Sequence, residues 1–368
     1  MKFRSIAAVL LACTLLGTAG CGTQQGGSSG TEPAPATSAV PQTQTQPEPT
    51  EAATEAATEA VSAVHNPLTG ETGYNQDAVG KRPIAVMVNN VKPSLPQYGI
   101  AAADMIYEIP VEGGITRLMA VYADYTDLPD ICSVRSCRYY YPILAYGMDA
   151  IYCHWGCDQT IAKDTLERLG IDRMDGGGVA NKVIFFRDPA RVGKYNTEHT
   201  GYLKGDAVPD AMEQFGFRTD TTAQDAFHFL DPEDPKKPEG ESCETVNAAF
   251  SQQYFSTFTY DAASQTYLKQ HSGKPHMDQK ADKQLAFTNV LILQTEIHTR
   301  PDGYLMDVAL KGGSGYYISM GAAQEIKWTK EGEDQPIRLF DKSGKELSVN
   351  AGKSYIGLIG TDRPVTIS

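Results

Sequence analysis

The sequence has 368 residues, of which 41% are hydrophobic and 9% aromatic, and its formal net charge is −13. This length and apolar content allow a buried core and two domains behind a non-globular front. The acidic balance and the lack of any basic run exclude general nucleic-acid binding, because polyphosphate backbones repel an acidic chain. After the leader, no apolar stretch is long enough to cross a bilayer.

The first 20 residues have the order of an export signal. Lys2 and Arg4 form a positive start, and an apolar run and several small residues then lead to Cys21. The ending Thr18-Ala19-Gly20-Cys21 resembles the lipobox of bacterial lipoproteins, which implies cleavage before Cys21 and a diacylglyceryl group on its thiol. Thr18 replaces the usual Leu, so a plain secretory signal remains an alternative. Cys13 is a rival lipidation site, but it would leave a very short apolar region.

Residues 22–64 contain no Lys, no Arg and no aromatic residue, and they include a Thr-Glu-Ala-Ala repeat. Such a segment cannot bury enough apolar surface to offset its ordering entropy, which predicts a disordered tether over residues 21–64. Two acyl chains anchor a protein stably. The signal peptide (residues 1–20) and the tether therefore predict a protein anchored by lipid to the extracytoplasmic face of the cell membrane.

Short apolar runs alternate with helical patterns in residues 65–230, which predicts an α+β or α/β N-terminal domain. Strands are expected at 83–88, 104–109, 117–122, 150–155 and 182–186. Helices are expected at 137–146, 159–169 and 207–215. Ser136 is the candidate N-cap of the first helix, and Gly147 and Gly170 are candidate C-terminal stops.

Three prolines and many charges over residues 231–242 predict an exposed linker. Strand patterns dominate residues 243–368, which predicts a mostly β C-terminal domain. Its strands are expected at 254–260, 265–270, 289–295, 304–310, 315–319, 325–329, 337–340 and 355–359. The segments Gly312–Gly315 and Asp341–Gly344 are expected to be tight turns between strands.

Several motifs of the predicted domains resemble the YerB-like lipoprotein family. They are His65–Gly70 (HNPLTG), Arg82–Asn90 (RPIAVMVNN), Ala103–Glu108, Val111–Met119, Ser133–Ser136 and Asp149–Tyr152, with Gly312–Gly315 and Ile326–Trp328 in the C-terminal part. The resemblance implies an exported lipoprotein with two domains of unknown function. It supplies no catalytic residues, and the cysteines at positions 132, 137, 153 and 157 depart from the family pattern.

Five cysteines remain once the leader is cut and Cys21 is lipidated: Cys132, Cys137, Cys153, Cys157 and Cys243. The first four could supply thiolates to a tetrahedral zinc ion, with His154 nearby. Their spacings are not the common CxxC, so this is a weak alternative. Disulfides are also permitted outside the cell, and small buried thiols are the simplest interpretation. No other metal site and no cofactor is predicted.

Arg135 and Arg138 flank Ser136 at the predicted helix start, and Ser133 adds a hydroxyl group. Free backbone N–H groups, the helix dipole and guanidinium groups all favour a carboxylate or phosphate there, which predicts an anion-binding site. The alternative is that the two arginines hold neighbouring strands together by pairing with carboxylates, namely Glu108, Glu112 or Asp158.

Glu112 and His199 complete the predicted ligand-binding set. Glu108 and Glu112 are close in sequence and could act as an acid and a base, although a strand that ends at a Gly-Gly turn also explains them. His199 lies in a polar loop, where ligand contacts are common. His154 ends an apolar strand and is more simply a core histidine. No complete catalytic motif of the HExxH, phosphate-loop or Ser-His-Asp type is present.

The leading hypothesis is a tethered lipoprotein that binds an anionic wall component, such as peptidoglycan or teichoic acid, or an envelope protein. The first alternative is an extracytoplasmic hydrolase that acts on wall polymer. The second is a structural or regulatory interaction protein. The sequence favours binding over catalysis, and it does not specify the ligand, the partner or the oligomeric state.

Overall fold

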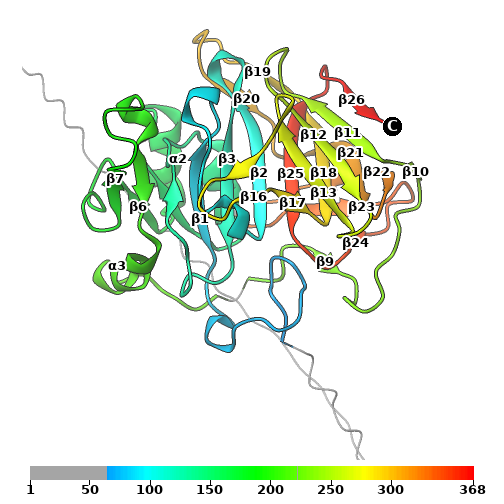
Figure 1. Ribbon diagram of the computed structural model, residues 1–368, viewed down its shortest axis with the longest axis horizontal. Coiled ribbons are helices and arrows are strands. Elements are labelled where there is room, and N and C mark those ends of the chain that lie inside the picture. Colours follow the sequence, from blue (N-terminus) through cyan, green and yellow to red (C-terminus); the bar gives the residue numbers. More distant parts are fainter. Residues whose placement is uncertain (1–63, 222) are drawn as a thin grey trace, which may run out of the picture. The chain divides into compact units, whose positions relative to one another are not determined.

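The computed structural model describes residues 64–368 apart from residue 222 (Figure 1). The predicted signal peptide, the lipidation site at Cys21 and the tether up to residue 63 lie outside the described residues. The described residues all belong to one compact unit, Val61–Ser368. In this part of the chain no helix is both long and apolar enough to cross a membrane.

A central sheet of eleven strands takes strands from both halves of the sequence (Figure 1). Its order is β10-β22-β21-β18-β25-β2-β3-β1-β5-β6, with β23 paired to β22. The first half supplies β1 (Ile84–Asn89), β2 (Met105–Val111), β3 (Ile115–Tyr122), β5 (Ile151–His154) and β6 (Arg173–Asp175). The second half supplies β10 (Glu241–Ser242), β18 (Asn289–Thr295), β21 (Gly312–Ser319), β22 (Ala322–Thr329), β23 (Arg338–Phe340) and β25 (Ser354–Gly360).

The two halves join where β2 pairs with β25 in parallel, from Met105 opposite Ser354 to Glu108 opposite Gly357. Strand β1 is buried along its whole length. Its side chains alternate between two apolar cores: Ile84, Val86 and Val88 lie in one, and Ala85 and Met87 in the other. A strand buried on both faces reads as a continuous apolar run, which explains why the central strands were predictable.

A second sheet of six strands belongs to the C-terminal half and has the order β14-β13-β12-β11-β26, with β17 paired to β13. In β13 every second residue is buried, and the inward positions are Tyr267, Lys269 and His271. The strands are β11 (Thr245–Ala249), β12 (Phe255–Asp261), β13 (Thr266–His271), β14 (Lys274–Pro275), β17 (Ala286–Phe287) and β26 (Val365–Ile367).

Short strands form small ribbons beside the two large sheets. One ribbon has the order β4-β8-β7 and the other three are pairs. The strands are β4 (Ile131–Cys132), β7 (Phe185–Arg187), β8 (Gly201–Leu203), β9 (His228–Phe229), β15 (Met277–Asp278), β16 (Lys283–Gln284), β19 (Ile297–Thr299), β20 (Met306–Val308) and β24 (Ser348–Val349). The N-terminal half therefore mixes helices with strands and the C-terminal half is mostly β, which confirms the predicted fold class.

Three α-helices occupy the first half: α1 (Tyr140–Tyr146), α2 (Ile161–Leu169) and α3 (Val208–Gln214). Single 3₁₀ turns are η1 (Gln76–Ala78), η2 (Lys92–Ser94), η3 (Ile100–Ala102), η4 (Glu112–Gly114), η5 (Thr197–His199) and η6 (Gly205–Ala207). Gly147 and Gly170 occupy the C-caps of α1 and α2, as predicted.

The prediction that Ser136 is the N-cap of α1 is wrong, because that position belongs to Tyr139. The backbone on either side of Ser136 pairs with other segments. Arg135 N–H donates to the Met87 carbonyl at 3.0 Å, and Cys137 N–H donates to the Gly156 carbonyl at 3.0 Å. These tertiary hydrogen bonds override the local capping signal, so Arg135 and Ser136 do not stand at a helix terminus.

Gly312–Gly315 is not a turn, because these glycines form the first half of β21. A Cβ atom on Gly313 would clash with the carbonyl oxygen of Gln294, and one on Gly315 with that of Ile292. The glycines thus allow β21 to lie close against β18. The turn predicted at Asp341–Gly344 is confirmed, with Gly344 N–H donating to the Asp341 carbonyl at 3.1 Å.

Candidate functional site

A surface pocket of about 460 Å³ lies beside the β4-β8-β7 ribbon and includes one of the two predicted arginines. We call it the Arg135 pocket. Its walls come from the segment after β4, the residue after β5, the end of β7 and the turn η5. The lining residues are Val134, Arg135, Trp155, Arg187, Asn196, Thr197 and Glu198.

Trp155 and Arg187 form a stacked pair in this pocket. The guanidinium carbon of Arg187 lies 4.2 Å from the centre of the Trp155 ring, and its Nη1 donates to the Thr197 carbonyl at 2.7 Å. Gly176 and Gly201 pack against the same indole, since a Cβ on either would approach the ring to 2.7 Å. Partial burial lowers the pKa of Arg187. The indole is therefore fixed, and the guanidinium is held over it by a second contact.

Arg135 and His199 meet through Glu198. Arg135 Nη2 donates to Glu198 Oε2 at 3.1 Å, and His199 Nε2 lies 3.6 Å from Glu198 Oε1. The amide of Asn89 donates to His199 Nδ1 at 2.9 Å, so the proton of the neutral ring is placed on Nε2, facing Glu198. Burial lowers the pKa of His199, and only 4% of the residue is exposed. His199 is thus a positioning residue behind the pocket.

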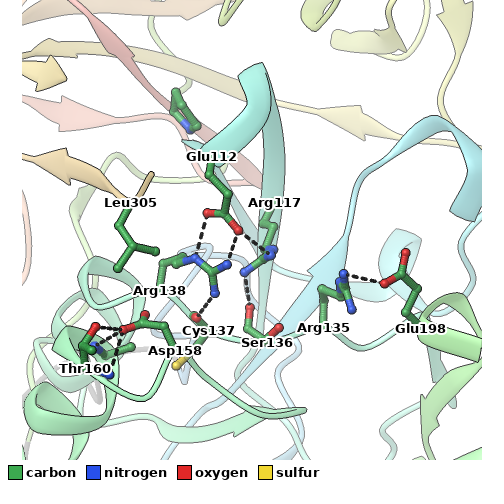
Figure 2. Close-up of polar contacts among 12 residues, drawn as sticks. Glu112, Arg117, Arg135, Ser136, Cys137, Arg138, Asp158, Thr160, Glu198 and Leu305 are labelled. Carbon is green, nitrogen blue, oxygen red and sulfur yellow. Dashed lines mark hydrogen bonds and ion pairs between the residues drawn. The ribbon is translucent and has the colours of Figure 1, made fainter. Parts of the chain in front are cut away.

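Arg138 and Glu112 are separate from this pocket and bind each other (Figure 2). Arg138 Nε donates to Glu112 Oε2 at 2.8 Å, and its Nη2 contacts Oε1. Arg117 Nη2 lies 3.4 Å from the same carboxylate. Burial raises the pKa of Glu112, but the hydrogen bond and charges of the two arginines outweigh it, and the pKa lies below its ordinary value. The alternative pairing of Arg138 with a carboxylate is therefore observed.

The two serines of the predicted set do not line the Arg135 pocket. The Ser133 hydroxyl is buried without a hydrogen-bond partner. The Ser136 carbonyl accepts a hydrogen bond from Arg117 Nη1 at 2.7 Å. Of the six predicted ligand-binding residues, only Arg135 lines the Arg135 pocket. His199 lies behind it, and Arg138 and Glu112 pair with each other elsewhere.

The four cysteines of the weak zinc alternative do not gather at one point. Cys137 and Cys157 are neighbours, with their backbones paired and their thiols hydrogen-bonded. Cys132 contacts Tyr98 instead, and burial alone raises the pKa of Cys153. All five cysteines of the described chain are free thiols. Within residues 64–368, leaving aside residue 222, no group of three or more His, Cys, Asp or Glu side chains could hold a metal ion.

Glu108 and Glu112 do not form an acid–base pair, because each has its own cation. The carboxylate of Glu108 is fully buried and lies 3.2 Å from Lys269 Nζ. It accepts four further hydrogen bonds, from the side chains of Asn90, Thr116, Ser256 and Tyr355. Burial raises the pKa of Glu108, but Lys269, His271 and these donors lower it below its ordinary value.

We call Glu108, Lys269, Ser256 and His276 the Lys269 cluster. Sequence reasoning missed it because its members come from distant segments. The signal that could have found it is the alternation in β13, where Lys269 and His271 share the inward face with Tyr267. Arg187 was also missed, although it directly follows the apolar residues Phe185 and Phe186 and enters a polar loop.

Two family models match the chain. One is described as "Protein of unknown function (DUF3048) N-terminal domain" and matches residues 68–218. The other, its C-terminal domain, matches residues 246–356. The chain belongs to the DUF3048 family. The predicted resemblance to the YerB-like proteins is confirmed by a relative and a solved structure that carry this name.

A Bacillus subtilis (strain 168) protein named "Putative lipoprotein YerB" is 29% identical over 303 residues, which is 80% of this chain and 85% of that protein. The crystal structure of YerB protein from Bacillus subtilis matches with a TM-score of 0.71 and 27% identity, over 82% of this chain and 99% of that one. The DUF3048 fold thus spans both matched regions, and the pairing of β2 with β25 joins them into one sheet.

Proposed function

We propose that this DUF3048 protein is a lipid-anchored binding protein of the extracytoplasmic membrane face, and that the Arg135 pocket captures an anionic component of the envelope. The leader that ends at Cys21 and the relative whose name contains the word lipoprotein support the anchor. The observation that carries the binding role is the convergence of Arg135, Arg187 and Trp155 on one pocket.

The charge of the pocket supports an anionic ligand. Two arginines face one carboxylate, Glu198, so the lining is net positive in a chain whose formal net charge is −13. Guanidinium groups bind carboxylates and phosphates through paired N–H groups. Arg187 Nη1 donates to the Thr197 carbonyl. The other N–H groups of its guanidinium remain available to a ligand. Phosphates of teichoic acid or carboxylates of peptidoglycan have the matching chemistry.

Retention on purified wall material tests this proposal. The soluble full chain carrying Cys21→Ala is compared with the same chain carrying Arg135→Ala and Arg187→Ala. We expect the double variant to be retained at least about 10-fold more weakly, because two charge-assisted contacts are lost. Retention equal to that of the parent chain would reject the proposal. Walls stripped of teichoic acid separate a phosphate ligand from a peptidoglycan carboxylate.

The matched control is Arg168→Ala. Arg168, on α2, forms an exposed ion pair with Glu333, as Arg135 does with Glu198. It is therefore an arginine in a similar environment outside the Arg135 pocket. We expect this control to keep the retention of the parent chain, and all variants to keep its thermal transition. If Arg168→Ala weakened retention as much as the double variant, net charge alone would explain the binding. Release of soluble wall fragments by the parent chain would favour the hydrolase alternative.

A further inference from the structure

A groove lies where the two halves of the chain meet, away from the residues of the Arg135 pocket. We call it the Lys92 groove. Its volume of about 510 Å³ falls within the range of small-molecule sites. One wall comes from η2 and the residues after it, and the other from the end of β13 through β15. The lining residues are Lys92, Leu95, Pro96, Gln97, His271, Ser272, Lys274, Pro275, His276 and Met277.

The Lys269 cluster fixes the floor of the Lys92 groove. Lys269 Nζ has three acceptors, at 2.8 Å to Ser256 Oγ, 3.1 Å to His276 Nδ1 and 3.2 Å to Glu108 Oε2. His276 Nε2 lies 2.9 Å from Gln97 Oε1. Because Lys269 donates to Nδ1, the proton of His276 is on Nε2 and is donated to Gln97. Both ring nitrogens of His276 are therefore in use.

His271 differs from His276, because it is similarly buried but makes no well-formed hydrogen bond. Only 3% of His271 is exposed, and its ring nitrogens have only a weak contact with the Asn90 backbone. Its ring packs 5.4 Å from that of His276 and 5.5 Å from that of Tyr254. A neutral imidazole always has one donor and one acceptor, and buried polar groups are rarely left without partners. An imidazole without a well-formed hydrogen bond in the wall of a groove points to a ligand group that completes it.

The lining has a defined charge and polarity. Lys92 and Lys274 are the only Lys or Arg side chains in this lining, and no ion pair of either is found among the described residues. No Asp or Glu lines the groove. The apolar part consists of Leu95, Pro96, Pro275 and Met277. This combination complements a molecule with one anionic end and one apolar end.

We infer that the Lys92 groove binds a small amphiphile with a single anionic headgroup, either a carboxylate or a phosphate monoester. The headgroup lies against Lys92 and Lys274 and accepts the N–H of His271. The hydrocarbon part packs on the prolines, Leu95 and Met277. Glu108, Ser256 and Lys269 contribute no ligand contact, but they hold His276 and the two walls in place.

Calorimetric titration of the full chain carrying Cys21→Ala tests this inference with four probes: decanoate, decyl phosphate, decanol and decyltrimethylammonium. We expect an anionic probe to bind at least about 10-fold more tightly than decanol, and the tighter of the two anions identifies the headgroup. Equal affinity for decanol and decanoate, or tighter binding of the ammonium probe, would overturn the inference.

Two variants locate the site. The double variant Lys92→Gln and Lys274→Gln should lose the preference for the anion, whereas the exposed-lysine control Lys342→Gln should keep it. His271→Phe keeps an aromatic ring but removes both nitrogens, so it should bind decanol normally and the anion more weakly. Equal losses in the control and the double variant would contradict the assignment.

A spectroscopic readout makes the test independent of the stability of the variants. The ring resonances of His271, assigned by their absence in His271→Phe, should shift when decanoate saturates the parent chain. Unshifted resonances would overturn the role of His271. The Arg135→Ala and Arg187→Ala variant should bind decanoate as the parent chain does, which separates this site from the proposed wall-binding pocket.

Discussion

The Arg135 pocket and the Lys269 cluster both place a cation against a carboxylate, but in opposite surroundings. The side chains of Arg135 and Glu198 are 28% and 49% exposed, whereas those of Lys269 and Glu108 are 0% and 1% exposed. Water screens the first pair, so either partner can be exchanged for a ligand at little cost. In the second pair each buried charge depends on the other. Exposure thus separates a pair that can bind from a pair that holds the two halves together.

Lys269→Met should produce the largest effect, because it leaves the Glu108 carboxylate buried without its cation. We expect a loss of about 3–5 kcal/mol in the free energy of unfolding, measured in urea. Adding Glu108→Gln removes the remaining charge and should restore part of the loss. The exposed pair of Lys342 with Glu325 is the control, and Lys342→Met should cost less than about 1 kcal/mol. If Lys269→Met lowered the free energy of unfolding no more than Lys342→Met does, the buried and exposed ion pairs would not differ in their contribution to stability.

Acidification should come next in size, through His276 of the Lys269 cluster and the neighbouring buried histidine His271. Burial, followed by the charge of Lys269, lowers the pKa of His271 from 6.5 to about 4, with Lys92 also lowering it and Glu108 opposing. Between these two values the unfolded chain binds more protons than the folded one, so stability falls as the pH drops from about 7 towards 4. For His271 alone the loss is roughly 1 kcal/mol near pH 5.5.

The check is a series of urea unfolding curves over this pH range, with His271→Phe as the comparison. This variant should show a shallower decline than the parent chain, because one of the titrating groups is gone. The decline in the free energy of unfolding could instead begin only in the pH range where carboxylates titrate. That result would show that Glu108 and Glu112, whose pKa values are also lowered, determine the loss of stability in acid.

Arg135→Ala should change stability by less than about 1 kcal/mol, since its ion pair is exposed. Wall retention should nevertheless fall. Thermal unfolding and the retention assay on the same protein measure the two effects together. A large drop in stability would mean that the Arg135 pocket, like the Lys269 cluster, depends on its own ion pair.

The smallest effect is expected from thiol modification, which compares the half-buried Cys157 with the buried Cys243. A hydrogen bond from Cys137 lowers the pKa of the half-buried Cys157, against a smaller effect of burial. Burial raises the pKa of Cys243 to about 11. Iodoacetamide should therefore modify Cys157 at least about 10-fold faster than Cys243 in the native protein. In denaturant the two rates should converge, and equal rates in the native protein would contradict this account.

The strands of the central sheet could be predicted because strands that are buried on both faces have continuous apolar sequences. The strand expected at 289–295 is β18 itself. The predicted helix ends at Gly147 and Gly170 were also correct. The predicted N-cap at Ser136 was wrong, because the backbone there forms hydrogen bonds with distant segments instead. Boundaries were predictable where local and tertiary preferences agree.

The candidate sites were much less predictable, since they depend on which loops meet. Arg135 was singled out at a predicted helix start and His199 in a polar loop. Arg187 from β7 and Trp155 from the end of β5 join Arg135 only in the folded chain. The link between Glu108 and Ser256 spans 148 positions of sequence. Propensity and spacing carry no information about such contacts, and the resemblance to a family without known active residues supplies none.

The place of β25 has a consequence for the biosynthesis of this protein. This strand lies between β18 and β2, although it is made long after β2. Until residues 354–360 have been synthesised, the edge of β2 has no parallel neighbour, and an unpaired strand edge invites association with other chains. A fragment that stops before Ser354 should therefore be prone to aggregation, and nascent molecules should need protection until β25 is available.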